Sequence, residues 1–88
     1  MLDANFSNQF VKDSKLMQKR GNDLELLFDI LAKIIWEEPL PERYREHNLS
    51  GDYSSYTECH VKGDWLIIYR FSPGKVTFTR TGSHSDLF

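Results

Sequence analysis

Three histidines fall beside turn or strand-end residues in the second half of the chain, where they are suited to acid–base chemistry. His47 lies in a connection rich in Pro, Asn and Gly, His60 ends an expected strand, and His84 follows Arg80-Thr81-Gly82-Ser83. The unperturbed pKa of imidazole is close to neutrality, so several imidazoles around one surface can accept and donate protons in one reaction. Asp64 lies just across a turn from His60. The alternative is that these side chains stand at strand ends by chance.

Size and composition indicate one small folded domain that spans residues 1–88. The chain is 40% hydrophobic and 14% aromatic, which is typical of globular proteins. A chain of this length buries only about 60–65% of its unfolded surface, so an open sheet face or a shallow groove is expected rather than a deep pocket. The net charge of −2 argues mildly against binding of nucleic acid by overall charge.

The sequence is consistent with a cytoplasmic protein. Its one cysteine, Cys59, cannot form an internal disulfide, which fits a reducing compartment. The N-terminal residues are neither basic nor followed by an apolar run, so no secretory signal is expected. No apolar stretch approaches the roughly 20 residues of a membrane span.

The first helix is expected to follow a short strand within residues 1–6. Ser7 or Asn8 can cap the N-terminus of this helix and Gly21 its C-terminus, so the helix should run to about Arg20. Its narrow inner face comprises Phe10, Ser14, Met17 and Gly21.

The second helix is more apolar and should be well buried. Asn22 can cap it, and Glu25 completes a pattern like a capping box. Pro39 ends it, and residues 39–52 then form a long irregular connection of the kind that is often functional. Residues at helical spacing predict the buried stripe, which Leu26, Phe28 and Ile30 widen: Leu24, Leu27, Leu31, Ile34 and Ile35.

From residue 53 the apolar pattern changes to a period of two, which predicts β-strands. The expected strands are Tyr53–Val61, Asp64–Phe71 and Val76–Arg80. Ser72-Pro73-Gly74-Lys75 suits a type II turn, because Pro and Gly take its two central positions. The three strands should therefore form an antiparallel meander.

The turn that joins the first two of these strands can be built in two ways. A three-residue loop, Val61-Lys62-Gly63, sets His60 opposite Asp64. A two-residue turn at Lys62-Gly63 sets His60 opposite Trp65 instead. A slip of one residue moves the side chains of a strand to the other face, so this choice decides which residues lie together.

Burial favours the three-residue loop. With the two-residue turn, Glu58 would lie on the apolar face, where burying a carboxylate is costly. The three-residue loop leaves the ionisable side chains together on an open face, with His60 and Asp64 as cross-strand neighbours. It also directs Trp65 into the core.

Three motifs in the second half of the chain are more specific than any single residue. They are H-x-L-x-G within Tyr44–Gly51, C-H-V-x-x-D-W within Glu58–Trp65 and R-T-G-[ST]-H-x-x-L-F at Arg80–Phe88. Together with Lys15–Gly21, and in this order, they resemble the YafQ family of bacterial toxins, a branch of the RelE/ParE superfamily. The resemblance covers essentially the whole chain.

The resemblance implies an α+β, RelE-like fold, in which N-terminal helices pack on one face of a mostly antiparallel sheet. It implies a ribosome-dependent mRNA endonuclease that uses no cofactor. It also implies a DinJ-like antitoxin as partner, expected in a heterotetramer. The matching catalytic positions are His47, His60, Asp64 and His84, and Phe88 also matches an active-site position.

RNA can be cleaved when its own 2′-hydroxyl attacks the neighbouring phosphorus. This reaction needs a base, an acid and positive charge near the phosphate, but no metal. His84 and His60 would share the proton transfers, in an order that the sequence leaves open, with His47 at the phosphate. Asp64 would orient a histidine or the hydroxyl. Arg80 would clamp the phosphate, because guanidinium matches phosphate geometry.

The remaining RNA contacts are expected from aromatic and basic side chains. Phe88 or Trp65 can stack on a base, and Lys62 is a further candidate contact. The mild acidity of the chain departs from the basic character usual in this superfamily, and it leaves ribosome contact to a local basic segment. That segment contains Lys12, Lys15, Lys19 and Arg20.

Two other functions are compatible with the same fold. One is a binding module, or a ParE-like inhibitor of DNA gyrase, which needs no cluster of imidazoles. The other is a ribonuclease that works without the ribosome, which a small open site disfavours because it positions substrate poorly.

Overall fold

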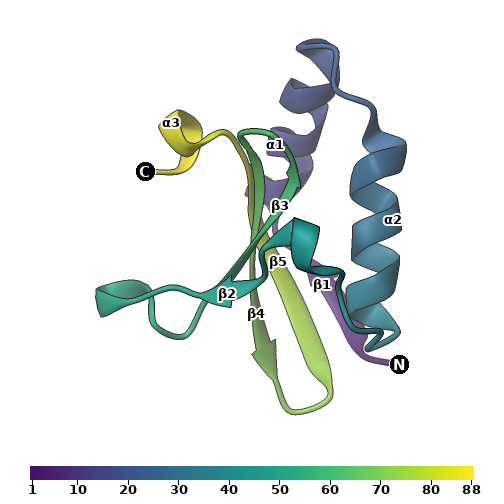
Figure 1. The fold of residues 1–88 in the computed structure, drawn as a ribbon, viewed down its shortest axis with the longest axis vertical. Helices are drawn as coiled ribbons and strands as arrows, with labels where there is room; N and C mark the ends of the chain where they lie inside the picture. Colours follow the sequence, from purple (N-terminus) through teal and green to yellow (C-terminus); the bar gives the residue numbers. More distant parts are fainter.

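A five-stranded sheet in the order β1-β5-β4-β3-β2 forms the centre of the protein, in a computed structural model that describes residues 1–88 (Figure 1). β1 is parallel to β5, and every other neighbouring pair is antiparallel. The α+β class and the mostly antiparallel sheet are therefore confirmed. The strands are β1 (Asp3–Phe6), β2 (His47–Asn48), β3 (Thr57–Lys62), β4 (Trp65–Ser72) and β5 (Lys75–Gly82).

Two long helices lie on one side of the sheet, and a short C-terminal helix lies on the other side (Figure 1). No helix is long and apolar enough to cross a bilayer. The helices are α1 (Asn8–Lys19), α2 (Leu24–Ile35) and α3 (His84–Leu87), with single 3₁₀ turns η1 (Glu42–Tyr44) and η2 (Gly51–Tyr53). The third helix was not expected from the sequence.

The ends of α1 follow from its capping residues. The Ser7 hydroxyl accepts a hydrogen bond from the Phe10 N–H at 2.9 Å, as expected for an N-cap. Gly21 adopts φ +92°, a conformation that favours glycine at the end of a helix. The prediction that Asn22 caps α2 was wrong by one residue: Asp23 accepts from Glu25 N–H at 3.0 Å. The Asn22 side chain donates to α1 instead, at the Met17 carbonyl.

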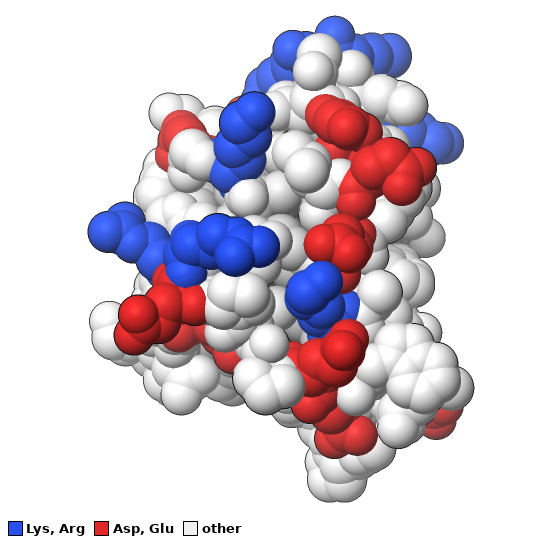
Figure 2. Space-filling model, turned by 45° about the vertical axis from the view of Figure 1, so that its right-hand side comes forward, with Lys and Arg blue, Asp and Glu red and all other residues white.

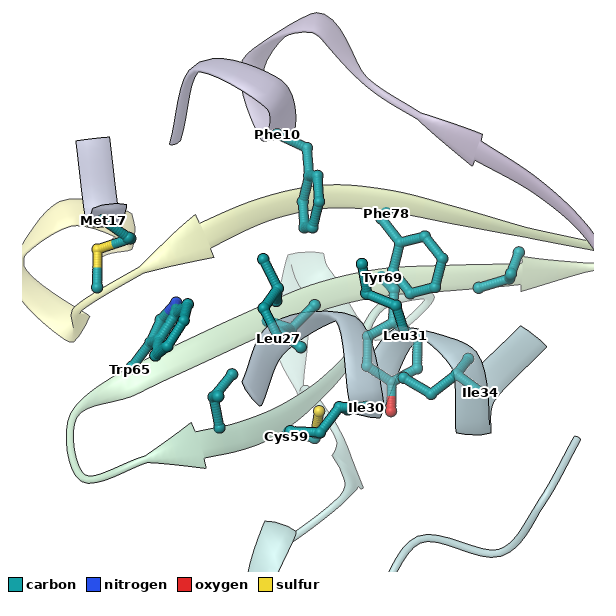
Figure 3. Packing of buried hydrophobic residues seen from close by; sticks show 13 residues of the cluster. Phe10, Met17, Leu27, Ile30, Leu31, Ile34, Cys59, Trp65, Tyr69 and Phe78 are labelled. Atoms are coloured by element: carbon teal, nitrogen blue, oxygen red, sulfur yellow. The ribbon is translucent and has the colours of Figure 1, made fainter. Parts of the chain in front are cut away.

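The core fills the space between the two long helices and one face of the sheet (Figure 3). Leu27 and Ile30 point from α2 toward Cys59 and Tyr69 of the strands. Trp65 is only 3% exposed, and its indole N–H donates to the Thr81 hydroxyl at 2.9 Å, so its expected core role is confirmed.

Parts of the expected helix faces are exposed. Of the four residues assigned to the inner face of α1, Phe10 and Met17 are buried, but Gly21 is exposed. Leu26 and Phe28 of α2 were expected to widen its buried surface, yet 40% and 51% of them are exposed. A helix that packs on one face of a sheet buries only the side that faces the sheet, so the outer side of this apolar helix faces solvent.

The hairpin between β3 and β4 uses neither predicted turn. Lys62 pairs with Trp65 across a two-residue turn, and a bulge follows, so that His60 pairs with Leu66. The prediction that His60 and Asp64 are cross-strand neighbours was therefore wrong. The bulge adds one residue to one strand, which restores the face alternation of the three-residue loop with a different pairing.

A second bulge lies in β5, where Ile68 pairs with Arg80 but Tyr69 pairs with Phe78. The extra residue changes the face on which later side chains lie. Phe78 is in the core, whereas Arg80 shares the opposite face with Ile68. The bulge thus brings a guanidinium to the face of the sheet that carries the histidines.

The segment before β3 is more ordered than the sequence indicated. β3 begins at Thr57 rather than at Tyr53, which instead ends the η2 turn. His47 was assigned to an irregular connection, but it forms β2 and pairs with Glu58. The edge of the sheet therefore fixes His47.

Candidate active site

His47 is held by contacts on both ring nitrogens. Its Nδ1 lies 2.7 Å from the Arg45 carbonyl, which can only accept, so Nδ1 donates. Its Nε2 lies 3.1 Å from Oε2 of Glu58. Arg45 adopts φ +51°, an uncommon conformation for a residue with a side chain, and such strain is often found at functional sites.

Glu58 is the functional residue that the sequence reasoning placed wrongly. It was expected on an open face, but it is only 5% exposed. Its Oε1 has no hydrogen-bond partner and lies 3.9 Å from Nε2 of His84. A buried carboxylate oxygen without a donor is destabilising, which is a common sign of a functional role. Its position two residues before His60, on the same face of β3, was the available signal.

His84 and Asp64 form the second imidazole–carboxylate pair. Nδ1 of His84 lies 2.6 Å from Oδ1 of Asp64, and the backbone N–H of His84 donates to the same oxygen at 3.3 Å. The hydrogen bonds from His84 lower the pKa of Asp64, so this carboxyl is ionised. An ionised carboxylate only accepts, so Nδ1 carries the proton and Nε2 faces Glu58.

Helix α3 holds His84 in this position. Ser83 and Asp86 form a reciprocal capping box at its N-terminus. The Arg20 guanidinium contacts both Asp86 oxygens, at 2.6 and 3.1 Å, and joins α3 to the end of α1. The hydrogen bond from Arg20 holds the pKa of Asp86 far below its usual range.

His60 lies within reach of both other histidines. Its ring centroid is 6.5 Å from that of His47 and 6.2 Å from that of His84. Its Nδ1 is 3.5 Å from the carbonyl oxygen of Gly63. The structure therefore brings together the four residues expected to be catalytic, although by contacts that the sequence did not indicate.

Arg80 is held by a buried carboxylate that the sequence did not single out. Its Nε and Nη2 donate to Asp13 of α1 at 2.7 and 3.3 Å. Thr81 N–H and the Gln9 amide also donate to Asp13. Burial raises the pKa of Asp13, but the hydrogen bonds from Arg80, Gln9 and Thr81 outweigh it, and the pKa is lowered. The guanidinium is thus fixed on one side.

The other two residues expected to contact RNA are Phe88 and Lys62, and only Phe88 lies beside the histidine cluster. The Phe88 ring lies 6.2 Å from the His84 ring, and Phe88 and Arg80 line the same small cavity. Lys62 is exposed at the end of β3, and no hydrogen bond or ion pair joins it to the histidines. No group of three or more His, Cys, Asp or Glu side chains is arranged to hold a metal ion.

A wider cavity of about 700 Å³ reaches His47 from another side. Glu37, Glu38 and Glu46 line it. Three carboxylates repel a phosphate, so this cavity is a poor site for a polyanion. The sheet face that carries the three imidazoles and Arg80 is the better site for a phosphate.

Three imidazoles, two carboxylates that orient them and a guanidinium on one open sheet face are suited to moving protons at a phosphate ester. Such a site on a small RelE-like α+β fold defines a toxin-type domain. The family model "Bacterial toxin of type II toxin-antitoxin system, YafQ" matches residues 2–88. The chain belongs to the YafQ family.

Similar proteins agree with this membership. The mRNA interferase toxin YafQ of Escherichia coli K12 is 39% identical over 98% of this chain and 95% of its own length. YafQ in the E. coli DinJ–YafQ complex superposes with a TM-score of 0.92 at 38% identity, over 100% of this chain and 99% of that one. A metal-bound toxin from Helicobacter pylori has the same TM-score and identity over 100% of both chains.

Proposed function

We propose that this chain is an endoribonuclease that cuts mRNA on the translating ribosome. The 2′-hydroxyl of the message attacks the neighbouring phosphorus, and the histidine cluster carries the protons without a metal. The observation that carries this proposal is the pairing of His84 with Asp64 and of His47 with Glu58 on one open face. The relatives named mRNA interferases support cleavage of mRNA.

His84 and His60 share the two proton transfers. With Nδ1 of His84 donating to Asp64, Nε2 of the neutral ring has a free lone pair and takes a proton. In its protonated form the same His84 ring can donate a proton. The His60 ring centroid lies 6.2 Å from that of His84, so both rings can contact one phosphodiester.

His47 and Arg80 stabilise the charge on the phosphate. The Arg45 carbonyl at Nδ1 and the Glu58 carboxylate at Nε2 orient the His47 ring, so that a protonated His47 can contact a phosphate oxygen. Arg80 keeps Nη1 free of protein hydrogen bonds while Asp13 binds Nε and Nη2. Its orientation is therefore set before RNA arrives, which reduces the reorganisation needed in the reaction.

The ribosome supplies the substrate positioning that a site this open lacks. Figure 2 shows Lys and Arg atoms at the top of the molecule, where α1 passes into α2, and Asp and Glu atoms in a column below them. Other Lys and Arg atoms are spread over the same face, but the basic end of the molecule can contact ribosomal RNA despite the net charge of −2. The basic side chains of α1 and its C-cap are Lys12, Lys15, Lys19 and Arg20.

The partner in the cytoplasm is a DinJ-like antitoxin, as in the complex of the E. coli relative. Exposed apolar side chains on the helices supply the surface that an antitoxin segment buries, within a heterotetramer. These are Val11, Leu16, Leu26, Phe28 and Trp36.

The test is cleavage of one message in a purified translation system and as naked RNA. We expect wild-type protein to cut only the translated message and His84→Gln to lose at least about 100-fold in rate. Asp64→Asn removes the carboxylate beside His84. Asp29→Asn is its control, because both carboxylates are 62% exposed and each pairs with one side chain. Absence of cuts by folded wild type would refute the proposal and favour a ParE-like binding role, and cuts in naked RNA would refute ribosome dependence.

A further inference from the structure

A small cavity of about 190 Å³ lies beside His84 and has no role in the proton transfers described above. Tyr53 of η2, Tyr56 before β3 and Phe88 at the C-terminus contribute its aromatic rings. Ile68 and Leu87 add apolar surface, and Thr79 and Arg80 complete the lining.

The aromatic rings of this cavity are not placed by core packing. Tyr53 is 55% exposed and Phe88 is 59% exposed. Their ring centroids are 6.3 Å apart with perpendicular planes, and those of Tyr53 and Tyr56 are 6.4 Å apart. Three segments that are separate in the sequence thus present their rings to one opening. Exposed aromatic surface arranged in this way is suited to a flat, partly apolar ligand.

The polar wall of the cavity narrows the choice of ligand. The Arg80 guanidinium is fixed by Asp13, and its Nη1 donates to no protein atom. A ligand with a planar part that stacks on aromatic rings and a phosphate that binds a guanidinium has the chemistry of a nucleotide. The ring of Phe88 is 6.2 Å from that of His84, so a base in this cavity is one nucleotide from the reacting phosphate.

We propose that this cavity binds the nucleobase next to the cleaved phosphate and sets the base preference of the cut. This proposal rests on the endoribonuclease function. Tyr53 and Phe88 stack on the base, and Tyr56 closes the inner side. Arg80 binds the neighbouring phosphate through Nη1 and so places the base in the cavity. Arg70 covers the other side of Tyr56, with its guanidinium carbon 5.5 Å from the ring centroid.

The first experiment measures binding without cleavage. 2′-O-methyl dinucleotides cannot react, and their effect on the ring NMR signals of Tyr53 and Tyr56 reports on the cavity, with buried Tyr69 as the internal reference. We expect saturable shifts that an abasic dinucleotide does not produce. Tyr53→Leu should weaken binding about 5- to 140-fold, the range for loss of one stacking ring. Phe71→Leu, which removes a ring of similar exposure (48%) on β4, should not.

The second experiment maps cuts in a message library in the translation system. We expect the wild type to prefer certain bases on one side of the cut, and Tyr53→Leu to cut more slowly with a weaker preference. Unchanged preference, or equal shifts with the abasic dinucleotide, would overturn the cavity proposal while wild-type cleavage upholds the enzyme. Ring shifts without wild-type cleavage would show that the cavity binds a base but would reject the enzyme, and with it the role of the cavity in the cut. Loss of antitoxin binding alone in Tyr53→Leu would mean that a protein occupies the cavity, and would overturn the proposal.

Discussion

Replacing Glu58 by Gln should change stability and activity in opposite directions. Glu58 is almost fully buried, contacts Nε2 of His47 through Oε2, and has an Oε1 without any donor. Glutamine keeps the shape of the side chain and removes its charge. Its amide can still donate to Nε2 of His47, because Nδ1 of that ring already carries a proton.

The expected gain in stability follows from the unpartnered oxygen. A buried polar atom without a partner destabilises a protein by roughly 1–3 kcal/mol, and by more when it is charged. A neutral amide oxygen at the same place is desolvated at lower cost. We expect the free energy of unfolding to rise by about 1 kcal/mol, which corresponds to an increase in Tm of roughly 4–8 °C for a domain of this size.

The expected loss of activity follows from the same charge. Without the carboxylate, neither His47 nor His84 has a negative group to stabilise its protonated ring on this side of the site. Acid–base groups contribute about 10²–10⁴ to a rate, and we expect Glu58→Gln to reduce cleavage by about 100-fold. The assays are thermal unfolding followed by circular dichroism and cleavage rates in the purified translation system.

A matched variant separates charge at the site from charge in general. Glu38 is exposed and makes no side-chain hydrogen bond or ion pair, so Glu38→Gln should leave both quantities nearly unchanged. A Glu58→Gln protein that is less stable than wild type and equally active would refute the reasoning, since Glu58 would then be an ordinary structural carboxylate.

Four further outcomes test other parts of the structure. Asp64→Asn should slow cleavage at least tenfold, and it should change Tm little because the His84–Asp64 pair is exposed. Equal rates for Asp64→Asn and Asp29→Asn in the translation assay would contradict the pairing. Arg20 lowers the pKa of Asp86 from its usual 3.8, so the stability from this pair is present above about pH 3.8 and is lost as the pH falls toward the pKa of the folded state. When Tm is measured from pH 6 to pH 2, it should therefore fall less steeply in Asp86→Asn than in wild type. Burial raises the pKa of Cys59 to about 12, so a thiol reagent at pH 8 should modify Cys59 only after denaturation, and rapid modification of the folded protein would show that this part of the core opens. Cleavage should continue in excess chelator, provided that the free magnesium concentration is kept constant so that the ribosomes stay intact. Loss of activity that zinc or copper restores would reject metal-independent chemistry.

Local signals in the sequence correctly predicted most of the elements. Ser7 and Gly21 mark the ends of α1 because capping depends on residues adjacent in the chain. The alternation along β3 and β4 placed Trp65 in the core and His60 on the opposite face. The motifs around the histidines indicated the family that the comparison with known proteins shows.

The details of the site depended on features that local patterns do not encode. Alternation fixes the face of a side chain, but a bulge changes the pairing while keeping the faces, so it could not reveal that His60 lies opposite Leu66. Asp64 was therefore assigned to the wrong histidine. The expectation of a solvated Glu58 failed for a related reason, since the two-residue strand that pairs with it has no sequence signal of its own.

The sequence by itself determined which residues are available for chemistry and which faces are apolar, because both follow from side-chain type and from spacing within single helices and strands. Only the tertiary structure decided which carboxylate orients which group. His84 meets Asp64 across 20 residues of chain, and Arg80 meets Asp13 across 67. Such contacts arise when the packed helices and bulged strands bring distant segments together, and no local periodicity specifies them.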